Sequence, residues 1–276
     1  MIDAAIIRTM AAKEKLDPGI IEKDYVLSKV LMALSQVDGF RNRLVFKGGT
    51  ALKKCYYRQW RFSEDLDFTS KTALSPSEVK NIFEKACEVA ARQSGLSLRV
   101  SEYSQYPKTS TKLTTAQLKL GYDGPLRKSS SQKNNVRVDI AFDETLVSGS
   151  VSREIFQQFN DDIETEIPTY ALEEIVAEKL RSILQRGKSR DYYDVWLLLK
   201  DFGNDFDHPK TKAILSQKCR FKEIPDPRAG DFFEKDRLAE AERFWERGLA
   251  HQLNDLPSFS TIIESLRDGI QKLLSQ

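Results

Sequence analysis

The chain has 276 residues, of which 40% are hydrophobic, so it can bury a substantial core and does not resemble a disordered protein. Its 43 basic and 41 acidic residues nearly balance, and the net charge of +2 does not by itself predict nucleic-acid binding. No apolar run approaches the roughly 20 residues of a membrane helix, and the N-terminus lacks the apolar core of a secretory signal. We therefore expect a cytoplasmic protein that does not contact a membrane.

Histidines and cysteines are few and scattered. The two histidines, His208 and His251, belong to no partner motif, so histidine catalysis and histidine metal sites are not expected. The three cysteines form no CxxC pair and no zinc spacing, which favours reduced, mostly buried cysteines in a cytosolic protein.

Apolar spacing and turn residues predict alternating helices and strands up to about residue 150. The expected helices span residues 18–36, from Ala51 to about Arg58, and 75–95. The expected strands span residues 43–47, 64–70, 96–104, 115–124 and 134–144, with an exposed polar loop at 128–135. From about residue 165 the pattern is helical, and the expected helical segments are 169–203, 230–253 and 258–276.

Two aspartates alternate with apolar residues in the expected strand at 64–70. Asp65 and Asp67 should therefore share one strand face, where their carboxylates repel each other unless a cation lies between them. Asp139 faces out with Arg137 in the expected strand at 134–144. If the two strands are neighbours, three carboxylates converge as in a two-metal phosphoryl-transfer site. An ordinary solvated strand face is the alternative.

A glycine turn ends the first expected strand. Gly48-Gly49 would let backbone N–H groups approach a phosphate at the start of the following helix, and Thr50 adds a hydroxyl. Ser63, two residues before Asp65, is expected on the same strand face. There it would contact a phosphate or a metal-bound group, or simply be a polar residue at the strand edge. The alternative for the glycines is an ordinary tight turn.

Basic and aromatic residues also gather near this turn, a mixture that suits an RNA backbone and its unstacked bases. They are Lys47, Lys53, Lys54, Arg58 and Arg61, with Tyr56, Tyr57 and Trp60. Residues 126–135, Lys108 and Lys112 would extend a positive rim. The alternative is that the aromatic residues are partly core.

The stretch GGTALKKCYYRQWRFSEDLDFT resembles the signature of the DNA-polymerase-β-like nucleotidyltransferase superfamily, a glycine turn followed after about a dozen residues by Asp-x-Asp. More narrowly, it is similar to the AbiEii/AbiGii toxin family, which includes the MenT toxins. That family typically shows Lys/Arg-Gly-Gly-Thr-x-Leu and then Arg-x-Ser-x-Asp-x-Asp. Residues 47–52 and 61–67 match these two patterns.

A second family signature, a Lys on one helix and Arg-Asp-x-x-Asp opening the next, resembles residues 171–198. Asp191 and Asp194 are spaced to lie on one helix face. The resemblance implies that Lys179 neutralises the triphosphate, that Asp191 belongs to the active site and that Arg190 binds nucleotide. Asp194 either joins them or holds the helix packing.

The resemblance implies an α+β fold with a polymerase-β-like mixed sheet flanked by helices and a helical C-terminal half. The expected domains are residues 1–160, an N-terminal helical arm plus the nucleotidyltransferase domain, and residues 161–276, a helical domain contributing to the active site. The expected activity is transfer of NMP from an NTP to an acceptor hydroxyl, with Mg²⁺, or Mn²⁺ as the alternative ion. The expected role is the toxin of a toxin–antitoxin or phage-defence pair.

Within that activity, the site residues have assigned tasks. Asp65 and Asp67 would hold the metals, and Asp139 would complete the metal site and act as base. Lys47, Gly48, Gly49, Thr50 and Ser63 would bind the nucleotide. The acceptor implied is RNA, the 3′ end of tRNA, and the partner implied is a cognate antitoxin encoded beside the toxin.

Three other functions stay open. One is a nucleotidyltransferase that modifies a protein, and a second is a catalytically silent nucleotide- or RNA-binding module, against which the three carboxylates argue. The third is a two-carboxylate hydrolase, which would leave the phosphate-binding turn unexplained and would need more widely spaced carboxylates.

Overall fold

The computed structural model describes residues 1–108, 113–127 and 134–275, and the chain forms two compact units. The first unit comprises Met1–Glu144 and Ser150–Thr169, and the second comprises Thr145–Gly149 and Tyr170–Gln276. The domain boundary was expected at residue 160, whereas the first unit continues to Thr169 and so includes most of the last strand along the chain, Glu166–Tyr170. Most of the polar loop expected at 128–135 lies outside the described residues, as does Lys112.

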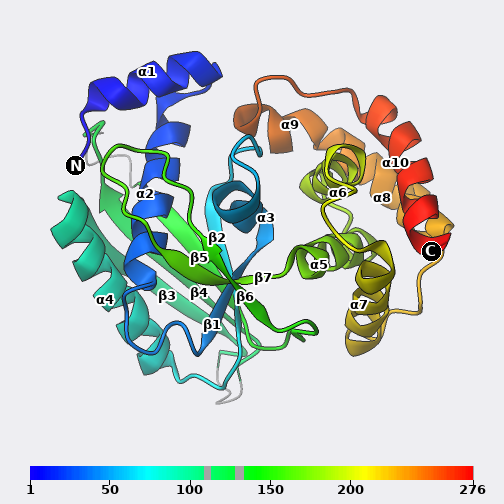
Figure 1. The fold of residues 1–276 in the computed structure, drawn as a ribbon, viewed down its shortest axis with the longest axis horizontal. Helices are drawn as coiled ribbons and strands as arrows, with labels where there is room; N and C mark the ends of the chain where they lie inside the picture. Colours follow the sequence, from blue (N-terminus) through cyan, green and yellow to red (C-terminus); the bar gives the residue numbers. More distant parts are fainter. Residues whose placement is uncertain (109–112, 128–133, 276) are drawn as a thin grey trace. The chain divides into compact units, whose positions relative to one another are not determined.

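The first unit is built on a mixed sheet, which has seven strands in the described residues, in the order β3-β4-β5-β2-β1-β7-β6 (Figure 1). The strands are β1 Leu44–Lys47, β2 Asp65–Ser70, β3 Ser97–Tyr106, β4 Thr115–Asp123, β5 Asn135–Ala141, β6 Ser150–Glu154 and β7 Glu166–Tyr170. β2 runs parallel to β5 and antiparallel to β1, and β1 runs parallel to β7. The expected mixed sheet is confirmed.

Helices flank this sheet. They are α1 Ala4–Glu14, α2 Pro18–Leu34, α3 Gly48–Ala51 with its π-helical continuation Leu52–Tyr56, and α4 Pro76–Ser94. A reciprocal capping box between Ser75 and Glu78 begins α4, and Gly95 ends it with a φ of 72°. α4 packs on β3 and on α2 (Figure 1). The expected helices are thus present, although the one predicted from Ala51 to about Arg58 begins earlier, at Gly48, and ends at Tyr56.

The apolar face of β2 packs into an aromatic cluster. Phe68 is fully buried, and its ring lies 5.7 Å from Phe40, 5.5 Å from Phe46 and 6.0 Å from Phe83 of α4. Leu66, on the same face of β2, is also fully buried. Because side chains alternate along a strand, the two aspartates of β2 lie on the opposite face, as predicted.

The second unit is helical in its described residues. Its elements are α5 Leu172–Gln185, α6 Ser189–Asp201, α7 His208–Phe221, the 3₁₀ turns Ala229–Phe233 and Ala250–Gln252, α8 Lys235–Arg243, α9 Trp245–Leu249 and α10 Phe259–Ser275. α6 packs on α5 and α10, and α7 packs on α5. A fully buried ion pair, Lys218 Nζ to Glu174 Oε1 at 2.8 Å, joins α7 to α5. The helical C-terminal half is confirmed.

Four elements have no predicted range of their own: α1, β6, β7 and α7. β6 is short and mostly exposed, and β7 has only five residues, so neither carries a clear alternating pattern. α7 did have a signal, because Asp207 accepts a hydrogen bond from the backbone N–H of Lys210 and Pro209 lies in the first turn.

The three cysteines are buried, as expected. Cys55, Cys87 and Cys219 are buried and free of disulfides, and burial raises the pKa of the Cys55 thiol to about 12. No helix in the described ranges is long and apolar enough to span a bilayer.

Replacing Phe68 tests whether the aromatic cluster holds the strand that carries the aspartates. Phe68→Ala should lower the free energy of unfolding by about 3–5 kcal/mol, because a fully buried ring is lost and a cavity is left. Urea denaturation followed by circular dichroism measures the change. Ile163→Ala, at a residue that is 40% exposed in the same unit, is the control and should change it by less than about 0.5 kcal/mol. Equal losses in the two variants would contradict the assignment.

Candidate active site

Three carboxylates occupy one face of the sheet. In the parallel pair of β2 and β5, the Cα partner of Asp67 is Asp139, and Asp65 lies two residues before Asp67 on β2. Neighbouring residues in register project to the same face, so the three side chains gather opposite the face packed on α4. The structure thus brings together the carboxylates that the sequence proposed as one group.

Arg137 lies among these carboxylates. Its Nη2 is 2.7 Å from Oδ2 of Asp65, its partner across the strand pair, and its Nε is 3.0 Å from Oδ2 of Asp139. Burial acts to lower the pKa of the guanidinium, but the charges of Asp65 and Asp139 outweigh it and raise that pKa above its ordinary value. Arg137 is therefore a permanent cation bridging two of the three acids.

A third strand adds a neutral donor. Gln117 of β4 is the Cα partner of Asp139, and its Nε2 donates to Oδ1 of Asp139 at 2.6 Å. Sequence reasoning missed Gln117, and it placed Arg137 on the face without assigning it a contact. Alternation in residues 115–124 does put Gln117 on the polar face of β4, but which strand lies beside β4 is not readable from the pattern.

The glycine turn adjoins the carboxylates directly. Gly48 has a φ of 79°, and a Cβ added there would lie 2.5 Å from Oδ2 of Asp67. A side chain at this position would therefore be strained by the backbone and would collide with the carboxylate. The contact explains why a glycine precedes the Asp-x-Asp motif in the fold: Asp67 lies against its Cα.

The second glycine faces two polar side chains. A Cβ on Gly49 would lie 2.9 Å from Nη2 of Arg61 and 3.6 Å from Oγ of Ser63. Arg61 and Ser63 are both buried. The expectation that Ser63 lies on the strand is wrong, because β2 begins at Asp65, and Ser63 instead lies beside the turn.

Two further predicted nucleotide ligands are buried at the same place. Lys47 is the Cα partner of Asp67 across β1 and β2, which puts it on the carboxylate face. Thr50 Oγ1 donates a hydrogen bond of 2.5 Å to the carbonyl oxygen of Asp65. The Thr50 hydroxyl therefore ties α3 to the start of β2, and its role toward a phosphate stays a prediction.

The basic surface expected around the turn is largely absent from the described residues, since only Arg58 of the five basic residues is exposed. Lys54 is fully buried, with its Nζ 2.8 Å from Oδ1 of Asp24. Lys53 donates to the carbonyl oxygen of Arg58 and lies over the ring of Phe62, and burial lowers its pKa. These lysines neutralise or cap groups inside the unit and offer no exposed phosphate contacts.

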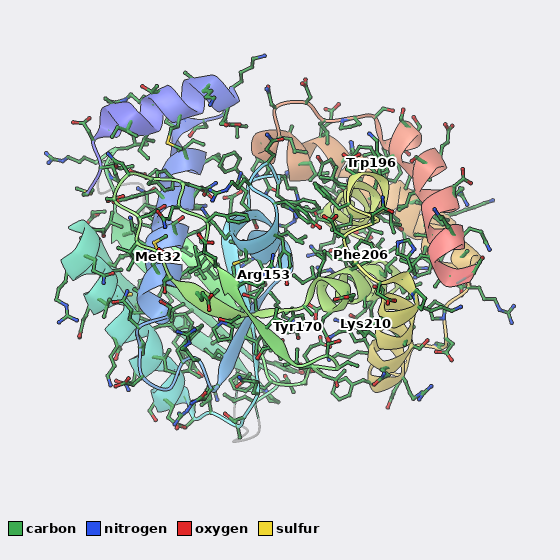
Figure 2. All side chains as sticks on the ribbon, in the orientation of Figure 1. Met32, Arg153, Tyr170, Trp196, Phe206 and Lys210 are labelled. Atoms are coloured by element: carbon green, nitrogen blue, oxygen red, sulfur yellow. The ribbon has the colours of Figure 1, made fainter. Side chains whose placement is uncertain are left out.

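The aromatic residues divide between core and rim. Trp60 is buried, whereas Tyr56 and Tyr57 are half-buried. The guanidinium of Arg153, labelled in Figure 2, stacks over the ring of Tyr56 at 4.4 Å. The interpretation that at least one of the three is core is confirmed for Trp60.

The second motif forms its own cluster in the helical unit. Lys179 of α5 lies between the two acids of α6, with its Nζ 2.7 Å from Oδ2 of Asp194 and 3.8 Å from Oδ1 of Asp191. Arg186 donates to both oxygens of Asp191, at 3.0 and 3.2 Å. Both acids are almost fully buried, and Arg190 is half-buried at the second position of α6. Asp194 is thus the nearer partner of Lys179.

The carboxylate face has the donors of a divalent-cation site. Asp65, Asp67 and Asp139 supply hard oxygen ligands, the type that Mg²⁺ and Mn²⁺ prefer. In the ranges that the structure describes, no group of three or more His, Cys, Asp or Glu side chains is placed to hold a metal ion as it stands. The guanidinium of Arg137 spans two of the three carboxylates instead. The chemistry of the donor set fits a metal, whose binding stays a prediction.

Comparison with solved structures places the fold among nucleotidyltransferase toxins. The nucleotidyltransferase toxin MenT4 from Mycobacterium tuberculosis H37Rv is similar over 100% of this chain and 89% of its own, with a TM-score of 0.68 and 20% sequence identity. The family model for "Nucleotidyl transferase AbiEii toxin, Type IV TA system" matches residues 29–268. The chain belongs to this AbiEii family of nucleotidyltransferase toxins of type IV toxin–antitoxin systems. A comparison with curated proteins gives no significant match.

Gly48→Ala tests the contact between the turn and the carboxylates. The added methyl group should displace Asp67 and reduce nucleotidyl transfer at least about tenfold, and the left-handed backbone should cost about 1–3 kcal/mol of stability. Gly39→Ala is the matched control, because Gly39 has a φ of 82° and a Cβ added there would lie no closer than 3.7 Å to the Arg43 side chain, at its Nε. It should lose similar stability and keep its activity. Equal loss of activity in both variants would contradict the steric explanation.

A double-mutant cycle tests the buried pair of the second motif. Asp194→Asn should lower the free energy of unfolding by about 1–3 kcal/mol, because the Lys179 ammonium loses its nearest anion. Lys179→Met in the Asp194→Asn background should cost less than it does in the wild type. Guanidinium denaturation of the four proteins gives the coupling energy, and a value near zero would show that the pair does not stabilise the unit.

Proposed function

We propose that this toxin transfers NMP from an NTP to a hydroxyl of RNA, the 3′ end of tRNA, and so blocks translation. The observation that carries the proposal is the register of Asp65, Asp67 and Asp139 on one sheet face beside the Gly48-Gly49 turn. Membership of the AbiEii family supports the nucleotidyl-transfer chemistry, the NTP substrate and an antitoxin partner.

The reaction is a substitution at the α-phosphorus. The acceptor oxygen forms a bond to that phosphorus, the bond to the β-phosphate oxygen breaks, and pyrophosphate leaves. Asp139 accepts the hydroxyl proton, and Mg²⁺ bound by the carboxylates would offset negative charge on the phosphates.

The remaining residues orient the nucleotide. Gly48 and Gly49 let the backbone approach the phosphates, with Lys47, Thr50 and Ser63 beside them. Lys179 offsets charge on the triphosphate, Arg190 assists it, and Asp191 restrains the position of Lys179. Asp194 holds Lys179 more closely and contributes packing.

A protein acceptor is the second candidate. Burial of Lys53, Lys54 and Arg61 removes much of the basic surface that the sequence offered to RNA. The turn and the carboxylates would serve a hydroxyl on a protein as well as one on RNA. The two acceptors are therefore distinguished only by which molecule receives the nucleotide.

Transfer of label from each α-³²P-labelled NTP, with Mg²⁺, to total tRNA or to cell-lysate protein tests both candidates. We expect labelled tRNA with the wild type, and at least about a 100-fold loss with Asp65→Asn or Lys179→Met, because each removes a charge that the reaction requires. Asp123→Asn, at an exposed position of β4, is the control and should keep full activity. Label on protein alone would favour the second candidate, and equal labelling by the wild type and Asp65→Asn would exclude the mechanism.

A further inference from the structure

A positive charge already occupies the carboxylate face. The guanidinium of Arg137 lies 2.7 Å from Oδ2 of Asp65 and 3.0 Å from Oδ2 of Asp139, so one cation bridges two of the acids proposed to bind metal. Three carboxylates on one face repel each other, and a cation among them relieves the repulsion. In this structure the protein supplies that cation itself.

The bridge engages oxygens that a metal would need. Gln117 donates to Oδ1 of Asp139, and Nε of Arg137 forms an ion pair with Oδ2 at 3.0 Å, so both oxygens of this carboxylate lie against protein nitrogens. A divalent cation that coordinates these oxygens of Asp65 and Asp139 must therefore compete with the positive charge of Arg137.

Arg137 can release the two carboxylates only if its side chain moves. An arginine does not lose its proton in a protein, so the positive charge cannot be removed by deprotonation. Its side chain is 48% exposed, and rotation toward water would leave the guanidinium solvated. The carboxylates are less exposed, at 21% and 24%, and the paired strands β2 and β5 fix the backbone positions of the residues that carry them.

We propose that Arg137 is a built-in counter-ion that competes with the divalent cation for Asp65 and Asp139. It holds Asp65 and Asp139 together before metal arrives, and it sets the concentration of divalent cation at which the site assembles. Arg137 acts through the carboxylates and is a positioning residue. The inference rests on the proposed metal role of those carboxylates.

Direct Mn²⁺ binding to the full chain without nucleotide tests the inference, measured by electron paramagnetic resonance of free Mn²⁺. Arg137→Gln should bind Mn²⁺ about tenfold more tightly or better, the size of effect expected when a like charge within about 4 Å is removed. Arg137→Lys keeps the charge and should therefore tighten Mn²⁺ binding less than Arg137→Gln does.

Lys119→Gln is the matched control. Lys119 is the Cα partner of Arg137 on β4 and is similarly exposed, at 45%, but its Nζ pairs with Glu102 at 2.7 Å. Removing its charge should change Mn²⁺ affinity by less than about twofold, because the pair is exposed and screened. Equal tightening in Lys119→Gln and Arg137→Gln would overturn the inference in favour of a general charge effect.

Thermal unfolding supplies a second readout. In EDTA, Arg137→Gln should unfold at a lower temperature than the wild type, because the carboxylates lose their counter-ion. Saturating Mn²⁺ should raise its unfolding temperature by more than it raises that of the wild type. A smaller metal-induced rise in Arg137→Gln would count against the inference.

The outcomes separate the inference from the proposed function. If the wild type binds Mn²⁺, Asp67→Asn weakens that binding and Arg137→Gln does not tighten it, only the role of Arg137 fails. If Arg137→Gln binds Mn²⁺ and the wild type does not, the inference is supported in its strongest form. If neither protein binds Mn²⁺, the metal role of the carboxylates fails and the inference fails with it.

Discussion

Repulsion among Asp65, Asp67 and Asp139 is the constraint on which the rest of the site depends. The in-register parallel pairing of β2 and β5 forces these carboxylates onto one face, because residues in register project to the same side. The opposite face of β2 is buried in the core, where Phe68 packs against its aromatic neighbours. A register slip would bury the aspartates and expose the core, so the strand cannot relieve the repulsion by shifting. The relief must come from cations and donors, and Arg137 and Gln117 supply it.

The same constraint explains the geometry of the turn. Asp67 lies so close to Gly48 that no side chain fits between them, and the positive φ of Gly48 already favours glycine. Thr50 then ties the first helical turn to the backbone of Asp65. Turn and strand are therefore tied together, which holds the two glycines close to the acidic residues of β2.

Charged side chains inside each unit serve structure as well as chemistry. Lys54 with Asp24, and Lys218 with Glu174, are buried pairs remote in sequence that join separate elements. Buried charges persist where they are paired, as the Lys54 ammonium beside the glycine turn is with Asp24. The cluster of Lys179, Asp191 and Asp194 follows the same rule, because the two buried acids share the Lys179 ammonium.

Short motifs determined a good part of this protein by themselves. Period-two alternation predicted the outward faces of Asp65, Asp67 and Asp139, and helical spacing predicted that Asp191 and Asp194 share one helix face. Both predictions succeeded because periodicity is a local property of the backbone. The two motifs, taken together, indicated the AbiEii family. Only the tertiary structure decided that β2 lies beside β5, that Arg137 bridges Asp65 and Asp139, and that Lys53 and Lys54 are buried. Strand pairing and burial depend on contacts between residues distant in sequence, such as Asp67 with Asp139 and Lys54 with Asp24, and no local pattern encodes those contacts.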